Sequence, residues 1–261
     1  MQTVTSKDGT TLAFDATGDG PPVVIVAGAS STRLPNTPFA ELLAERFSVF
    51  NYDRRGRGDS GDTPPYAVER EIEDLAAVIE AGRGEAAVLG LSSGANLSLR
   101  AAAAGVDIGG LALWEPNFVV NDGRPPLPAD YVDHLNELTS SDRRGDAVEY
   151  FMTVAVGLPA EFVAPMREMP MWPGMEAVAH TIAYDGTIVG DSMSGKPLSP
   201  DRFAAVTVPA LVLVGGTTPW LNDGGHALAE ALPHGQLRQL DGQTHDVAPD
   251  VLVPALMDFF S

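Results

Sequence analysis

The sequence contains no cysteine among its 261 residues. That absence excludes disulfide bonds, thiolate metal sites and a cysteine nucleophile. Positive charge is also scarce, because 16 Lys and Arg stand against 35 Asp and Glu, for a formal net charge of −19. Nucleic acid is therefore not expected as a partner, since binding to phosphates requires the opposite charge.

Long apolar runs and targeting signals are missing as well. The longest apolar stretches, such as residues 23–27, are far too short to span a bilayer, so no membrane association is expected. The N-terminus lacks the basic region and apolar core of a secretion signal, which leaves the cytoplasm as the expected location. No Gly-x-Gly-x-x-Gly follows the first long strand and no metal-ligand spacing is present, so we expect neither a cofactor nor a metal.

Short apolar strands alternate with helical patterns over most of the chain. The sequence predicts strands at residues 2–6, 10–17, 23–27, 47–52, 86–89, 111–114, 210–214 and 237–240, and helices at 38–46, 68–81, 95–104, 224–232 and 249–260. The first two strands flank a turn and form a hairpin. The strand at 23–27 has no polar alternation, as expected when helices cover both faces of a sheet. The pattern therefore predicts an α/β fold with a mostly parallel sheet.

The alternation disappears between about residues 116 and 208. Helical patterns occur there at 129–138, 144–156 and 159–164, beside a cluster formed by Met166, Met169, Met171, Trp172 and Met175. We expect a helical cap insertion at 116–208 over one core made of 1–115 and 209–261. The cluster is either the ordinary core of that insertion or an adaptable lid over a substrate pocket, since methionine repacks easily.

The segment Gly90-Leu91-Ser92-Ser93-Gly94 joins a predicted strand to a strong helix former. A serine on such a turn, with a glycine two positions away on each side, is typical of the nucleophile elbow of serine hydrolases. The turn is too sharp for a Cβ at either glycine, and it strains the serine backbone. The hydroxyl of Ser92 is then held above the sheet, next to the first amides of the following helix.

With two further motifs, the elbow makes the chain resemble the α/β-hydrolase family over nearly its whole length outside the insertion. Residues 53–60 look like the family's Asp-x-Arg-Gly-x-Gly-x-Ser loop, and His245 follows the last strand, where the family places its histidine. The resemblance implies an eight-stranded, mostly parallel sheet with helices on both faces. It also implies that residues 53–60 mainly tie neighbouring turns together through salt bridges.

The resemblance suggests a role for each site residue. Ser92 is the expected nucleophile, and His245 is the expected base that activates its hydroxyl. The oxyanion hole needs two backbone amides, and we expect them from Ser93 and Ala29. The family usually has His-Gly-x at the second position, where this chain reads Ala27-Gly28-Ala29.

The third member of the triad is not where the family usually has it. After the strand at 210–214 the chain has Thr218 in place of an aspartate, and threonine cannot offset the charge on an imidazolium. Either the triad is broken or another carboxylate serves. Glu115, directly after the strand at 111–114, is the first candidate and resembles the acid of some haloalkane dehalogenases. Those enzymes have an aspartate nucleophile where this chain has Ser92. Asp223 is the second candidate.

These features predict a serine hydrolase that cleaves a small, fairly hydrophobic ester, lactone or related acyl compound through an acyl-serine intermediate. Two alternatives stay open. The missing acid after the seventh strand would also suit a non-hydrolytic protein that binds a small molecule on the same fold. A cofactor-free perhydrolase would keep the serine but divert its chemistry. The sequence determines neither the substrate nor the oligomeric state.

Overall fold

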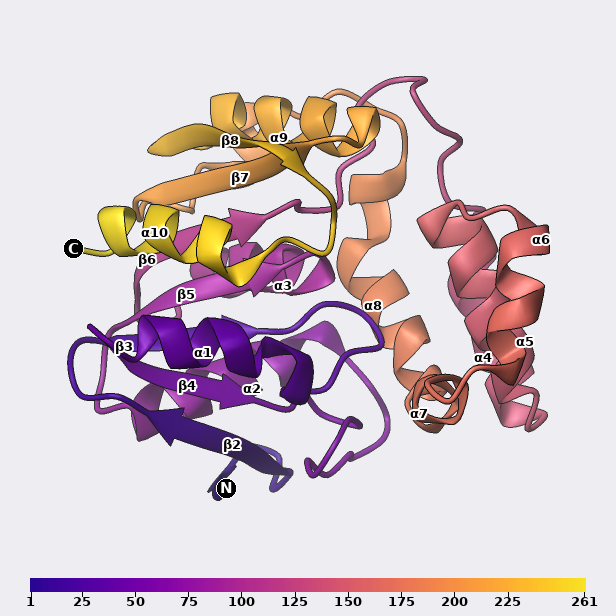
Figure 1. The fold of residues 1–261 in the computed structure, drawn as a ribbon, viewed down its shortest axis with the longest axis horizontal. Helices are drawn as coiled ribbons and strands as arrows, with labels where there is room; N and C mark the ends of the chain where they lie inside the picture. The colour runs from indigo at the N-terminus through magenta and orange to yellow at the C-terminus, as the bar shows by residue number, and fades with distance from the viewer.

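The computed structural model describes residues 1–261 and contains one sheet of eight strands (Figure 1). The strands are β1 Gln2–Thr5, β2 Thr11–Thr17, β3 Pro22–Val26, β4 Ser48–Tyr52, β5 Ala86–Leu91, β6 Ile108–Trp114, β7 Ala210–Gly216 and β8 Gly235–Gln243. The α-helices are α1 Thr37–Leu43, α2 Val68–Ala81, α3 Ser93–Ala103, α4 Tyr131–Ser140, α5 Arg144–Tyr150, α6 Ala160–Val163, α7 Trp172–Ala177, α8 Ile182–Val189, α9 Pro219–Ala231 and α10 Pro249–Phe259. None of these helices is long and apolar enough to cross a membrane.

The strand order across the sheet is β1-β2-β4-β3-β5-β6-β7-β8. Only the pairs β1–β2 and β2–β4, at one edge, are antiparallel. The remaining neighbours are parallel, so the carboxyl ends of β3, β5, β6 and β7 all lie along the same edge of the sheet. The predicted α/β fold with a mostly parallel eight-stranded sheet is confirmed.

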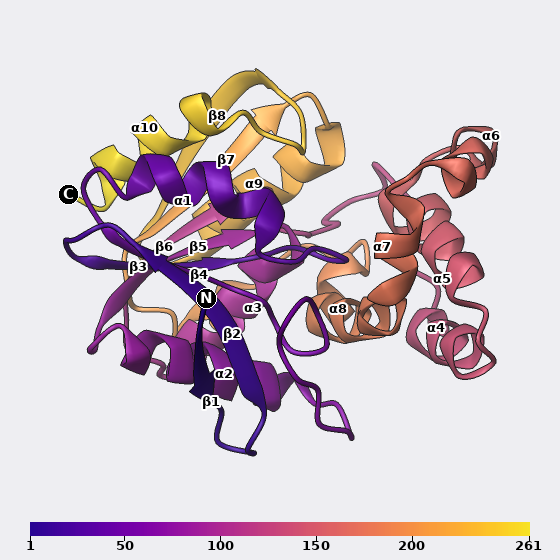
Figure 2. The same cartoon turned by 60° about the horizontal axis from the view of Figure 1, so that its bottom comes forward.

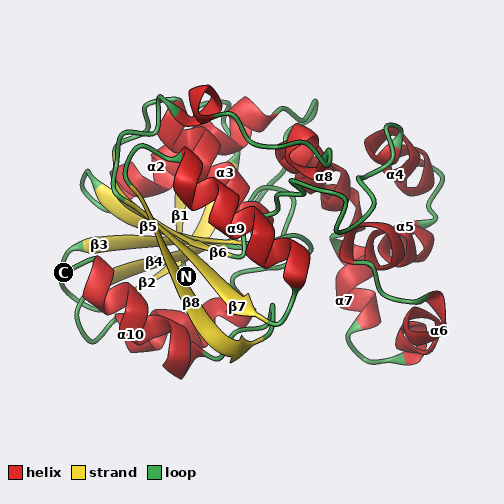
Figure 3. Ribbon diagram, turned by 90° about the horizontal axis from the view of Figure 1, so that it is seen from above, coloured by secondary structure: helices red, strands yellow, loops and turns green.

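Helices cover both faces of the sheet (Figure 3). Successive strand residues point to opposite faces. Val24 and Val26 accordingly belong to an apolar cluster with α2, α3 and α9, whereas Val23 and Ile25 belong to a second cluster with α1 and α10. This burial on both sides explains why β3 shows no polar alternation.

Residues 116–208 form a helical segment that contains no strand. Figures 1 and 2 show α4 to α7 beside the sheet, with α8 between them and the other helices. Side chains of this segment alone build a separate apolar cluster of ten buried residues, which includes Tyr131, Leu135 and Trp172. Met166 and Met175 pack against that cluster, whereas Met169 and Met171 are 47% and 50% exposed. The predicted methionine cluster is therefore split between core and surface.

The structure differs from the predicted helices at three places. The pattern at 144–156 is α5 followed by a π-helical turn, Phe151–Val156. Helices α7 and α8 were not predicted. Helix α8 is apolar on most sides because it packs against α4 of the same segment and against α3 of the sheet domain. It therefore lacks the one-sided apolar pattern that identifies a surface helix.

Helix α9 begins at Pro219, five residues before the predicted start at 224. Gly224 and Gly225 lie inside the helix, where they face neighbouring segments. A Cβ on Gly224 would stand 2.3 Å from the carbonyl oxygen of Phe118, and one on Gly225 would stand 2.4 Å from Cγ1 of Val214. The two glycines therefore allow α9 to approach the sheet and the chain after β6.

Buried ion pairs attach the helical segment to the rest of the fold. Arg54 and Arg57, in the loop after β4, donate to opposite oxygens of Asp185 in α8 at 2.8 and 2.7 Å. Arg54 also pairs with Glu71 of α2 at 2.7 and 2.9 Å, and all four side chains are buried. The salt-bridge role predicted for residues 53–60 is confirmed.

The same charges control the ionisation of Asp185. Burial by itself raises the pKa of this carboxyl, but the positive charges of Arg57 and Arg54 and a hydrogen bond from Ser93 outweigh it. The pKa of Asp185 consequently lies below its ordinary value. Its ionised form is thus part of the folded structure.

Replacing Asp185→Asn tests this attachment. The variant leaves two buried guanidinium groups short of a counter-ion, and we expect the free energy of unfolding to fall by about 3–5 kcal/mol at pH 7. Because the folded-state pKa is depressed, the wild-type contribution is present above about pH 5 and is lost as pH falls. The difference in the free energy of unfolding between wild type and Asp185→Asn, measured by urea unfolding, should therefore narrow by about 1 kcal/mol between pH 7 and pH 3. Asp258→Asn, which removes an exposed pair with Arg238, is the control and should cost about 1 kcal/mol or less.

Two glycine substitutions test the packing of α9. Gly224→Ala should destabilise the protein by about 1–3 kcal/mol, because the added methyl group meets the Phe118 backbone. Gly174→Ala, in helix α7, meets no atom within 4 Å and should stabilise by about 0.5–1 kcal/mol. The midpoint temperature of thermal unfolding is measured for both variants and for wild type. Equal shifts of this temperature in the same direction would contradict the packing described for α9.

Candidate active site

Ser92 stands at the turn between β5 and α3 with φ 54° and ψ −121°. This is a strained conformation for a residue with a side chain. The flanking glycines permit it, since a Cβ on Gly90 would lie 2.6 Å from the Cα of Ala95, and one on Gly94 would lie 2.3 Å from the carbonyl oxygen of Val26. The close approach of α3 thus requires glycine at position 90, and the close approach of β3 requires glycine at position 94.

The turn after β3 lies directly against Ser92. A Cβ on Gly28 would be 3.2 Å from the Cβ of Ser92 and 3.8 Å from its Oγ. The backbone N–H of Ala29, the next residue, donates to no other backbone group. Ser93 is the first residue of α3, so its N–H has no partner within the helix. Two donors expected for an oxyanion hole thus lie on segments that meet at Ser92.

Glu115 follows β6 and contacts His245, which lies in the loop after β8. The Nδ1 atom of His245 is 2.6 Å from Oε2 of Glu115, and the N–H of Gly215 donates to Oε1 at 3.0 Å. The Glu115 side chain is fully buried and that of His245 is 45% exposed. Trp114 Nε1 also donates to the carbonyl oxygen of His245 at 2.9 Å. A carboxylate at this place favours the tautomer with the proton on Nδ1, which leaves Nε2 free to accept one.

Glu115 shares the backbone strain of Ser92, with φ 40°. Its N–H donates to Leu213 of β7, and the N–H of Ser92 donates to Trp114 of β6, both at 2.9 Å. Two non-glycine residues with positive φ therefore follow the neighbouring strands β5 and β6, at the same edge of the sheet. Such strain is held only where surrounding contacts determine it, and it gathers at functional sites.

The residues after β7 are not hydrogen-bonded to His245. The hydroxyl of Thr217 donates to the carbonyl oxygen of Gln243 at 2.8 Å, and Thr218 precedes the first residue of α9. The carboxylate of Asp223 accepts a hydrogen bond from Asn121 at 2.8 Å in an exposed position. Of the two acid candidates, only Glu115 is hydrogen-bonded to His245.

Ser92 and His245 are not hydrogen-bonded to each other. Ser92 Oγ instead donates to Oδ1 of Asn117 at 3.3 Å. The backbone of Asn117 is held by Asn96 of α3, whose side chain accepts from its N–H at 2.9 Å and donates to its carbonyl oxygen at 3.2 Å. Sequence reasoning missed Asn117, although its position two residues after Glu115 puts it at the same edge of the sheet.

A second missed contact comes from the helical segment. The Ser93 hydroxyl donates to Oδ1 of Asp185 at 2.8 Å, and Arg54 Nη1 donates to the carbonyl oxygen of Ala27 at 3.2 Å. The buried ion network therefore touches both segments that carry the unpaired amides. No local pattern links Asp185 to Ser93, which are 92 residues apart.

The structure brings together no group of three or more His, Cys, Asp or Glu side chains that could hold a metal ion.

Comparison with known proteins identifies relatives of this fold. A sequence model of the alpha/beta hydrolase family matches residues 23–255. The crystal structure of an alpha/beta hydrolase from Sphaerobacter thermophilus DSM 20745 is 54% identical, with a TM-score of 0.92 and coverage of 100% of both chains. The 2-(acetamidomethylene)succinate hydrolase of Mesorhizobium japonicum (strain LMG 29417 / CECT 9101 / MAFF 303099) is 25% identical over 264 residues, which cover 95% of this chain and 91% of that protein.

More distant structures share the architecture. The enol-lactonase from Burkholderia xenovorans LB400 is 22% identical, with a TM-score of 0.69 and 99% of each chain covered. At that identity the similarity shows the fold alone. The family match, in contrast, extends over most of the chain. The expectation of a hydrolytic enzyme is confirmed, and the chain belongs to the alpha/beta hydrolase family.

Proposed function

We propose that this protein is a serine hydrolase that cleaves a small, fairly hydrophobic ester, lactone or related acyl compound. The observation that carries the proposal is the 2.6 Å contact between the Glu115 carboxylate and His245 Nδ1, at the sheet edge where Ser92 is strained. In this proposal Ser92 is the nucleophile, His245 is the base and Glu115 is the acid of the triad.

The proposed reaction begins with proton transfer. Ser92 Oγ exchanges its hydrogen bond to Asn117 for one to His245 Nε2, and it attacks the substrate carbonyl as the imidazole takes its proton. Glu115 offsets the charge of the resulting imidazolium and holds the ring in one orientation. His245 then returns the proton to the leaving group. Water releases the acyl group from Ser92 by the same steps.

The amides of Ala29 and Ser93 are the proposed oxyanion hole. They would stabilise the negative charge that develops on the carbonyl oxygen in the tetrahedral intermediate. Because both are backbone groups, they do not depend on the histidine that the family usually has in the turn after β3. The contacts of Arg54 with Ala27 and of Asp185 with Ser93 support a fixed position for both turns.

We propose further that residues 116–208 act as a cap over a core of residues 1–115 and 209–261. Five of the large apolar side chains that are exposed lie in one part of that segment: Val156, Leu158, Phe162, Met169 and Met171. An exposed apolar group of this kind is suited to a hydrophobic substrate. The names of two similar proteins, a 2-(acetamidomethylene)succinate hydrolase and an enol-lactonase, support acyl compounds as the substrate class.

Labelling with a fluorophosphonate probe tests the nucleophile. We expect wild-type protein to react at Ser92, with the modified peptide identified by mass spectrometry, and Ser92→Ala to remain unlabelled. Ser140→Ala, which changes an exposed serine of α4, is the control and should still react. An unmodified Ser92 in folded protein would favour a binding protein, and peracid formed from acetate and peroxide would favour a perhydrolase.

A pair of carboxylate substitutions tests the acid. Glu115→Gln keeps the shape of the side chain but loses the charge, so we expect kcat on an activated ester to fall by about a thousandfold or more. Asp223→Asn, the matched control, removes a carboxylate that bonds Asn121 and should leave kcat within about threefold. The assignment is wrong if the two variants lose activity in the opposite order.

A further inference from the structure

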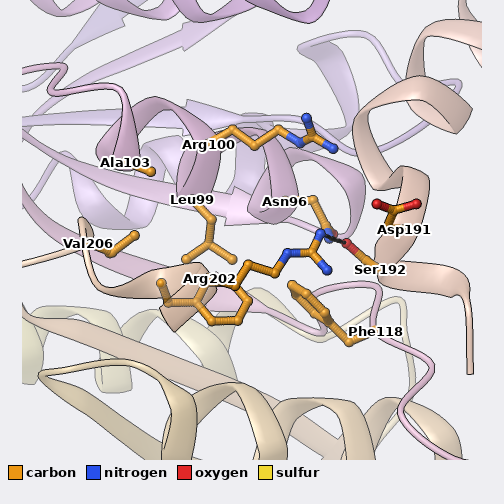
Figure 4. Close-up of a pocket in the computed structure, with 10 residues that line it drawn as sticks. Asn96, Leu99, Arg100, Ala103, Phe118, Asp191, Ser192, Arg202 and Val206 are labelled. Atoms are coloured by element: carbon orange, nitrogen blue, oxygen red, sulfur yellow. Dashed lines mark hydrogen bonds between the residues drawn. The ribbon is translucent and has the colours of Figure 1, made fainter. Parts of the chain in front are cut away.

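A cavity of about 480 Å³ lies along α3, outside the proposed active site (Figure 4). Its other walls come from the short helical turns Gly190–Met193 and Pro200–Phe203. This volume is within the range of small-molecule sites. One part of the lining is apolar, with Leu99, Phe118 and Val206, and the other part carries two arginines.

The two arginines outnumber the single carboxylate that lines the cavity, Asp191. Arg100 and Arg202 line the same cavity but form no ion pair, in a chain where acidic residues outnumber basic ones by 35 to 16. Figure 4 shows both guanidinium groups directed toward the side of the cavity that holds Ser192 and Asp191. Burial lowers the pKa of Arg100, and the positive charge of Arg202 lowers it further. The two arginines and Asp191 leave a net charge of +1 at the cavity, which a ligand with one negative charge would balance.

A buried hydroxyl beside the arginines has a proton to donate. Ser192 Oγ accepts hydrogen bonds from Asn96 Nδ2 and from Arg202 Nη2, both at 3.3 Å, and donates to no protein acceptor. Ser192 is 3% exposed. A buried hydroxyl usually uses its proton in a hydrogen bond. This wall of the cavity therefore offers several hydrogen-bond donors, and Asp191 is its one carboxylate.

We propose that this cavity binds an organic monocarboxylate with a short apolar tail. The carboxylate lies between Arg100 and Arg202 and accepts the Ser192 proton, while the tail packs on Leu99 and Phe118. Asp191 also lines the cavity, and its negative charge disfavours ligands with two charges, such as phosphate or a dicarboxylate.

The cavity is connected to the elbow by hydrogen bonds. Ser192 contacts Asn96, which holds the backbone of Asn117, which in turn accepts from Ser92. A ligand that draws on Ser192 can therefore alter the environment of Ser92. A carboxylate with an apolar tail is also the kind of acid that ester hydrolysis releases. The binding site stands independently, whereas its effect on turnover rests on the proposed function.

Calorimetric titration with hexanoate tests the site. We expect saturable binding by the wild-type protein and binding at least tenfold weaker in Arg100→Gln and in Arg202→Gln, since each loses a charge-assisted hydrogen bond. Arg46→Gln, which removes an exposed arginine without an ion pair, is the charge-matched control and should bind like wild type. Circular dichroism establishes that each variant is folded.

Two further ligands determine the chemical class. 1-Hexanol, which has the tail without the charge, and sulfate, which has charge without the tail, should each bind at least tenfold more weakly than hexanoate. The proposal is overturned if hexanoate does not bind, if sulfate binds as tightly, or if the arginine variants bind as Arg46→Gln does. Fluorophosphonate labelling of Ser92 is measured in parallel, so arginine-dependent binding without labelling would remove the proposed function and keep this site.

Discussion

The contact between Glu115 and His245 depends on the parallel order of the central strands. Because β5, β6 and β7 run in the same direction, their last residues meet at one edge, and a residue that follows one strand can serve a neighbour. The Glu115 carboxylate uses both oxygens there, one for His245 and one for the Gly215 amide. The loop after β8 is thereby joined to the end of β6.

Close backbone approach is the second requirement of this edge. The elbow and the end of β3 are so near that a methyl group at Gly94 would overlap the Val26 carbonyl. The same nearness brings the Ala29 turn against Ser92. Strain at Ser92 and Glu115 is sustained by these contacts, because neither backbone conformation is favourable by itself. Stability and the geometry of the site therefore come from the same packing.

Charge has different uses in different parts of this acidic chain. Arg54 and Arg57 are buried and fully compensated, and they hold Asp185 and thus the helical segment against the sheet. Arg100 and Arg202 form no salt bridge, and the cavity that they line holds a single carboxylate, Asp191. An arginine paired with a buried carboxylate holds the fold together, whereas an excess of arginines over carboxylates at a cavity suits an anionic ligand.

The sequence by itself determined the elements that have a local signature. The elbow glycines, the hairpin turn and the apolar strands depend on near neighbours, so the strands and the position of Ser92 could be predicted from local patterns. The candidates Glu115 and His245 followed from the resemblance to the α/β-hydrolase family. Local patterns placed the start of α9 five residues too late, and only the structure shows that Gly224 and Gly225 let this helix approach Phe118 and Val214. They also missed α8, because a helix buried on most sides has no polar face. Only the tertiary structure decided which carboxylate meets His245, and that Asn117 and Asp185 contact the elbow serines, since these contacts join residues 25 to 130 positions apart.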